Sequence, residues 1–155
     1  MGGRPGRASG PEASRLRVLV DSSAWADFLN GYPSLESAEV AALIRSDHEL
    51  CTCGVIVAEV FQGLRREKGR AELAQLFGDL VLLEPVGLAS YFRAADLYRA
   101  LRQRGKTIRS TIDCLIAVLA AEHSCYLLAR HRDLETIVES RLLTTALWPP
   151  AAAGV

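Results

Sequence analysis

The sequence feature that most constrains the fold is the stretch VLVDSSAW at residues 18–25. Three apolar residues run directly into Asp21, and two hydroxyl residues follow it. This pattern predicts a buried strand over residues 17–20 and a helix whose N-cap is Ser22 or Ser23. Because ligands of open α/β sheets bind at the carboxyl ends of the strands, Asp21 either caps that helix or contributes to a metal site.

Length and composition favour one globular domain and exclude several classes of protein. The chain has 155 residues, half of them hydrophobic, and 18 basic residues balance 18 acidic ones. A sizeable core is therefore expected, without an overall basic field for nucleic acid. No apolar run approaches the roughly 20 residues that span a bilayer, and no signal peptide is evident, so we expect a cytoplasmic protein with reduced cysteines.

Hydrophobic periodicity predicts strands that alternate with helices. Residues 1–15, rich in Gly, Pro, Arg and Ser, are expected to form a disordered arm before a domain over 16–149, and 150–155 a flexible tail. This order predicts an α/β sandwich with a mostly parallel sheet. In the helix over 88–104, we expect Leu88, Tyr91, Phe92, Ala95 and Tyr98 to be buried. Strands are predicted over 17–20, 49–52, 80–83, 126–129 and 142–147, and helices over 22–31, 34–46, 55–64, 71–77, 88–104, 111–124 and 131–138.

Four acidic residues stand where catalytic carboxylates would be expected. Asp21 and Asp133 follow apolar strands, whereas Glu59 and Asp113 lie in the first turns of apolar helices. If these positions meet at one edge of the sheet, the carboxylates repel one another unless a cation joins them. Oxygen ligands suit Mg²⁺ or Mn²⁺, which can activate water for phosphodiester cleavage. Taken singly, each acid also has a structural interpretation as a cap, a solvated residue or a partner of a helix dipole.

Four segments, VDSSAW, AEVFQGLR, RGKTIRSTIDCLIAVLA and LLARHRDLETI, occur in this order and resemble the motifs of PIN-domain ribonucleases. The most similar group is the VapC toxins of bacterial toxin–antitoxin pairs, and the resemblance extends over about residues 17–147. It implies a three-layer α/β/α fold and an endoribonuclease that depends on Mg²⁺, for which Mn²⁺ can substitute. It also implies a homodimer and a cognate antitoxin, which would lay a helix or tail into an apolar groove formed by the helices over 22–31 and 54–64.

The resemblance also assigns roles to individual residues. Asp21, Glu59 and Asp113 match the first three active-site acids, with Asp21 and Asp113 as the main metal ligands. Ser23 matches a polar position beside the first acid, where it would support the site and bind substrate. The fourth position departs from the usual Leu-Leu-His-x-Asp-x-Asp-Phe pattern, because this chain reads LLARHRDL. His131 stands at the first Asp of that pattern and Asp133 at the second, so either residue is a candidate for the fourth ligand.

Basic residues form two clusters that are either solvated surfaces or contacts for RNA phosphates. Arg109, which is close in sequence to Asp113, is the first candidate for a substrate contact. Two other functions remain open: a non-catalytic PIN-like module that binds RNA or an antitoxin, and a phospho-accepting receiver domain. The receiver domain is disfavoured because it needs a Lys after a late strand, which LLAR and LLTTAL do not supply. The clusters are Arg65, Arg66, Lys68 and Arg70, and Arg99, Arg102, Arg104, Lys106 and Arg109.

Overall fold

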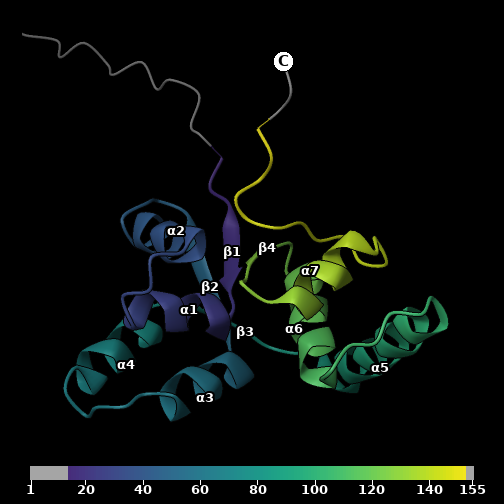
Figure 1. The fold of residues 1–155 in the computed structure, drawn as a ribbon, viewed down its shortest axis with the longest axis horizontal. Helices are drawn as coiled ribbons and strands as arrows, with labels where there is room; N and C mark the ends of the chain where they lie inside the picture. Colours follow the sequence, from purple (N-terminus) through teal and green to yellow (C-terminus); the bar gives the residue numbers. More distant parts are fainter. Residues whose placement is uncertain (1–13, 153–155) are drawn as a thin grey trace, which may run out of the picture.

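A parallel sheet of four strands, in the order β3-β2-β1-β4, lies at the centre of the computed structural model, which describes residues 14–152 (Figure 1). The predicted arm over 1–15 lies outside the described residues except for its last two positions, and so does the end of the predicted tail over 150–155. The strands are β1 (Arg17–Val20), β2 (Glu49–Cys53), β3 (Val81–Leu83) and β4 (Tyr126–Leu128).

Strand β1 occupies the middle of the sheet because its residues are apolar on both faces. Val18, Leu19 and Val20 are fully buried, as expected for a parallel strand covered by helices on both sides. Leu19 pairs with Cys51 of β2 and with Leu127 of β4. These pairings place the carboxyl ends of β1, β2 and β4 at one edge of the sheet, where the loops into α1, α3 and α7 begin.

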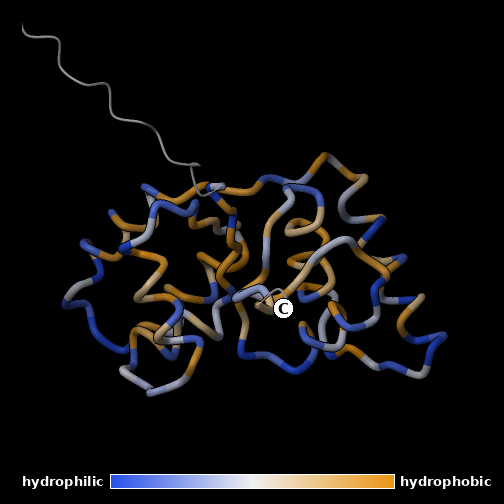
Figure 2. The backbone as a smooth tube through the Cα atoms, turned by 90° about the horizontal axis from the view of Figure 1, so that it is seen from above, coloured by the Kyte–Doolittle hydropathy of each residue, from blue (hydrophilic) through white to orange (hydrophobic). Residues whose placement is uncertain are grey.

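Helices cover both faces of the sheet, which confirms the predicted three-layer α/β/α architecture. Figure 1 shows α1 to α4 on one side of the strands and α5 to α7 on the other. In Figure 2 the hydrophilic segments lie mainly at the periphery. Among residues 14–152, no helix combines the length and apolarity needed to cross a membrane. The helices are α1 (Ser22–Leu29), α2 (Leu35–Ile44), α3 (Gly54–Gln62), α4 (Arg70–Gly78), α5 (Gly87–Gln103), α6 (Thr111–Glu122) and α7 (Arg132–Glu139).

The predicted last strand over 142–147 is wrong. The segment makes only an isolated parallel bridge between Leu127 and Leu147. A turn precedes it, with Arg141 in the left-handed region at a φ of 58°, and bends on both sides of Leu147 limit the pairing with β4 to this one bridge. Trp148 anchors the segment, since its indole nitrogen donates a hydrogen bond to Glu39 and its ring packs edge-on against Tyr126.

The predicted buried face of α5 is also wrong except at Tyr98, which is partly buried against the core. Leu88 and Phe92 are 70% and 65% exposed, and the buried positions lie on the neighbouring stripe. The apolar pattern did not predict this stripe because it contains the polar residue Ser90. Ser90 is fully buried, and its hydroxyl donates to the Glu122 carboxylate at 2.8 Å. The buried residues of α5 are Ser90, Ala94, Leu97 and Leu101, and α5 packs against α6.

Candidate active site

Asp21 lies at the carboxyl end of β1 and is only 3% exposed. It is itself the N-cap of α1, so the prediction that Ser22 or Ser23 caps this helix is wrong. Its Oδ2 accepts hydrogen bonds from the backbone N of Ser23 at 3.1 Å and from Ser23 Oγ at 2.6 Å. Both roles considered for Asp21 are therefore compatible, because one carboxylate oxygen caps the helix while the other is left for a ligand.

Ser23 ties this first acid to the loop between β4 and α7. Its Oγ accepts a hydrogen bond from the backbone N of Arg130 at 3.0 Å. The Arg130 guanidinium pairs with Asp27 at 3.1 Å and stacks over the ring of Tyr32, with 4.5 Å between its Cζ and the ring centroid. Through Arg130, helix α1 thus fixes the start of the loop that carries the fourth candidate ligand. The sequence did not predict this role of Arg130.

Glu59 is held by a hydroxyl that sequence reasoning also missed. Ser22 Oγ donates a hydrogen bond to Glu59 Oε2 at 2.5 Å, which joins α1 to α3. Glu59 lies in the second turn of α3 rather than in the first, because the helix begins at Gly54 directly after β2. Successive residues of a helix point about 100° apart, so the adjacent hydroxyls of Ser22 and Ser23 support two different acids.

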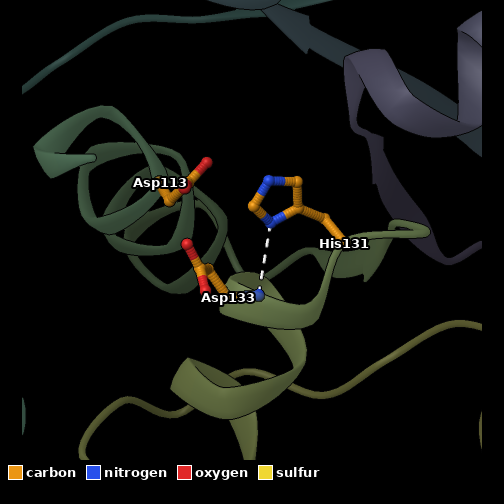
Figure 3. Close-up of side chains that lie close together, drawn as sticks. All are labelled: Asp113, His131 and Asp133. Atoms are coloured by element: carbon orange, nitrogen blue, oxygen red, sulfur yellow. Dashed lines mark hydrogen bonds between the residues drawn. The ribbon is translucent and has the colours of Figure 1, made fainter. Parts of the chain in front are cut away.

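Asp113, His131 and Asp133 form the other half of the site (Figure 3). Each offers one ligand atom, and these atoms lie within 4.8 Å of one another. Asp113 is in the first turn of α6, whereas His131 is the N-cap of α7 and Asp133 follows in its first turn. Asp133 Oδ2 accepts a hydrogen bond from the backbone N of Arg109 at 3.1 Å. The exposed Arg109 is therefore linked to the site through its backbone.

Charges from both halves of the site act on Asp113. Burial is the largest cause that raises the pKa of Asp113; His131 lowers it, and the charges of Asp21, Asp133 and Glu59 raise it. Carboxylates that repel one another in this way favour a cation between them. The donor set of the cluster, two carboxylates and one imidazole, fits a divalent ion such as Mg²⁺ or Mn²⁺. Asp21 and Glu59 are not part of the group whose ligand atoms lie within 4.8 Å of one another.

Two thiols lie close to the acids, but neither is suited to bind a metal. Burial first, then the charges of Asp113 and Asp133, raise the pKa of Cys114 to about 11. Burial also raises the pKa of Cys53, and the charges of Asp21 and Glu59 act in the same direction. Both thiols therefore stay protonated at neutral pH, and a thiol binds metals as the thiolate. They pack as small buried hydrophobes.

A cavity of about 570 Å³ opens beside the acids and is lined by residues of α1, α3 and α4. It includes the two helices that were predicted to form a groove, those over 22–31 and 54–64. Ser22 and Glu59 of the site also line it, so a molecule bound there would lie next to Glu59. Its other wall is strongly basic and consists of Arg65, Arg66, Lys68 and Arg70.

A parallel sheet with carboxylates converging at its carboxyl edge defines a class of α/β proteins suited to bind a divalent cation. Residues 18–139 match the family described as PIN domain, and the chain belongs to this family. This membership removes the receiver domain from consideration. The chain is 31% identical over 130 residues to ribonuclease VapC11 of Mycobacterium tuberculosis and to VapC ribonuclease Mb1587 of Mycobacterium bovis, with 83% of this chain and 97% of each relative covered.

Solved structures share the fold. The structure of VapBC2 from Rickettsia felis, bound to a DNA fragment from its promoter, superimposes with a TM-score of 0.61 at 17% identity, covering 86% of this chain and 99% of that one. VapBC-1 from nontypeable Haemophilus influenzae gives a TM-score of 0.62 at 16% identity, covering 87% and 100%. At these identities the likeness establishes the fold of this chain, and its activity has to be argued from the site.

Proposed function

We propose that this protein is a metal-dependent endoribonuclease that hydrolyses RNA phosphodiester bonds and acts in the cytoplasm as the toxin of a toxin–antitoxin pair. The observation that carries the proposal is the position of the acids at the carboxyl edge of the sheet, where Asp21 follows β1 and the ligand atoms of Asp113, His131 and Asp133 lie within 4.8 Å of one another. Membership in the PIN domain family and relatives named VapC ribonuclease support it. The catalytic residues proposed are Asp21, Glu59, Asp113 and Asp133.

In this proposal Asp21 and Asp113 are the main ligands of Mg²⁺, or of Mn²⁺ in its place. When bound, such an ion supplies an activated water and neutralises charge on the phosphate. The protein's own contribution is to hold the acids in place before the metal binds. Ser23 holds Asp21 and Ser22 holds Glu59. Preorganised groups of this kind need little reorganisation during the reaction.

Substrate binding is proposed for Arg109 and Ser23. The backbone N–H of Arg109 donates to Asp133, so this exposed residue is next to the site, and its guanidinium is of a kind that pairs with RNA phosphates. Ser23 Oγ already donates to Asp21 and accepts from Arg130, so a substrate contact would be added to these two bonds. This arrangement favours support of Asp21 as the main role of Ser23.

The proposed antitoxin binds in the basic cavity between α1, α3 and α4. The solved relatives are complexes named VapBC, and the cavity borders Glu59, so a bound segment would block the acids. Its basic wall suits a segment that carries acidic side chains. We also propose a homodimer, for which exposed apolar side chains on α5 offer a surface, namely Leu88, Tyr91 and Phe92.

The proposal is tested with purified, antitoxin-free protein and total bacterial RNA. We expect discrete fragments with Mg²⁺ or Mn²⁺, none with EDTA, and none from the Asp21→Asn variant. The matched control is Asp47→Asn, the same change at an exposed residue just before β2, at the opposite edge of the sheet. Cleavage that persists in Asp21→Asn would point to a contaminating nuclease. A folded protein that cuts no RNA would favour the non-catalytic module.

A further inference from the structure

We propose that His131 makes this site a mixed imidazole–carboxylate centre that binds a divalent transition-metal ion, Mn²⁺ among them, in preference to Mg²⁺. The inference rests on the proposed function only in that the same acids bind the metal. It concerns the chemical class of the ion, which the acids alone do not determine.

The geometry brings the imidazole into the ligand set. His131 lies on the loop between β4 and α7, and Figure 3 shows its ring beside Asp113 of α6 and Asp133 of α7, on the side that both carboxylates border. Their ligand atoms lie within 4.8 Å of one another. Opposite ligands of an octahedral Mg²⁺ ion are about 4.2 Å apart, twice the metal–oxygen distance. Small side-chain rotations therefore suffice to bring all three onto one ion.

The chemistry of the three donors favours a transition ion over Mg²⁺. Mg²⁺ prefers oxygen ligands and gives up its waters reluctantly, whereas imidazole binds first-row transition ions, with Mn²⁺ the weakest binder of the series. One oxygen of the Asp133 carboxylate, Oδ2, already accepts a hydrogen bond from the backbone N–H of Arg109. The α6–α7 half of the site thus offers carboxylate oxygens to both kinds of ion, and it offers a transition ion an additional nitrogen ligand.

His131 also has a structural role, which the experiment has to separate from ligation. Its Nδ1 accepts the backbone N–H of Asp133 at 3.3 Å and so caps α7. A neutral imidazole has one lone-pair nitrogen, so binding a metal through either nitrogen ends this bond. Because this hydrogen bond is long, its loss should reduce the stability of α7 only slightly. Ser and Asp are both good N-caps, and replacing His131 by either one preserves the cap.

The experiment measures metal binding to the full chain without RNA. Mn²⁺ binding is followed by electron paramagnetic resonance, Mg²⁺ is added as competitor, and pulsed measurements detect ¹⁴N coupled to the bound Mn²⁺. We expect ¹⁴N coupling in the wild type and its loss in His131→Ser, with Mn²⁺ affinity reduced at least about tenfold, since even outer-shell changes cost that much. In His131→Asp, an added oxygen ligand should lower the preference for Mn²⁺ over Mg²⁺ by about tenfold.

The control is His48→Asn, which removes an imidazole at the opposite edge of the sheet. His48 Nδ1 accepts the backbone N–H of Leu16 just before β1, so its loss should leave metal binding unchanged. Absence of Mn²⁺ binding, absence of ¹⁴N coupling, or an unchanged metal preference in His131→Asp would overturn the inference and leave His131 as a cap. Nitrogen-coupled Mn²⁺ binding without any metal-dependent RNA cleavage would instead overturn the proposed function alone.

Discussion

The two halves of the acidic site hold their carboxylates by different means. On the α1–α3 side, Asp21 and Glu59 each accept a short hydrogen bond from a serine hydroxyl, at 2.6 and 2.5 Å. On the α6–α7 side, Asp133 accepts a backbone N–H at 3.1 Å, and Asp113 faces an imidazole. The first half is thus fixed by short side-chain bonds, whereas the second leaves a histidine and an aspartate oriented toward a shared space. We infer that the second half adjusts when a ligand binds.

The largest effect is expected from Asp113→Asn, which removes a ligand charge at nearly constant volume. RNA cleavage should fall by about a hundredfold or more, because a metal ion contributes several kcal/mol of charge stabilisation. The fold should be retained, since the lost charge is one that burial and the facing acids disfavour. Cleavage rate and thermal midpoint are measured together. Asp96→Asn, the same change at an exposed position of α5, serves as control, and an unchanged cleavage rate in Asp113→Asn would contradict the site.

Metal binding should raise the free energy of unfolding of the whole domain. A ligand at a hundred times its dissociation constant adds about 2.7 kcal/mol to the free energy of unfolding. For a domain of this size that corresponds to a rise of about 5–10 °C in the thermal midpoint. We expect the rise with Mn²⁺, its reversal by EDTA and its reduction in Asp21→Asn. An equal rise in Asp21→Asn would show that the ion binds elsewhere.

A smaller effect is expected from Ser22→Ala, which tests whether the short bonds of the first half contribute to function. Glu59 loses its 2.5 Å bond and with it a fixed orientation, so cleavage should fall by about tenfold, equivalent to about 1.4 kcal/mol. Ser34→Ala is the control: it removes the N-cap bond of α2 at 3.0 Å and should lower stability by about 1 kcal/mol without changing the cleavage rate. Equal rates in Ser22→Ala and wild type would remove the distinction between the halves.

The same comparison shows what could be predicted from the sequence. The run of apolar residues into Asp21 predicted β1 and its terminal carboxylate, because a buried parallel strand has an unmistakable composition. Ser22 was missed because contacts between α1 and α3 depend on how the helices pack. In α5, the polar Ser90 belongs to the buried stripe and is satisfied by Glu122, so an apolar pattern alone selected the wrong face. His131 was identified as a departure from a motif and as a candidate fourth ligand, and its position beside Asp113 and Asp133 required the structure.

The outer surfaces of the two halves also differ. A substitution on the outer surface of α5 is expected to have the smallest effect on the free energy of unfolding. Beside α1 and α3 lies a basic cavity, whereas α6 is backed by α5, on which Phe92 remains 65% exposed. If the exposed apolar surface of α5 forms the proposed homodimer, Phe92→Asp should shift the protein from dimer to monomer in light scattering after gel filtration. A charge in a desolvated contact is unfavourable, whereas surface changes usually alter the free energy of unfolding by no more than about 0.5 kcal/mol. The control Arg99→Asp introduces the same side chain at an exposed position of the same helix and should leave the dimer intact. A dimer that survives Phe92→Asp would assign self-association to another surface and leave the apolar residues of α5 without a partner.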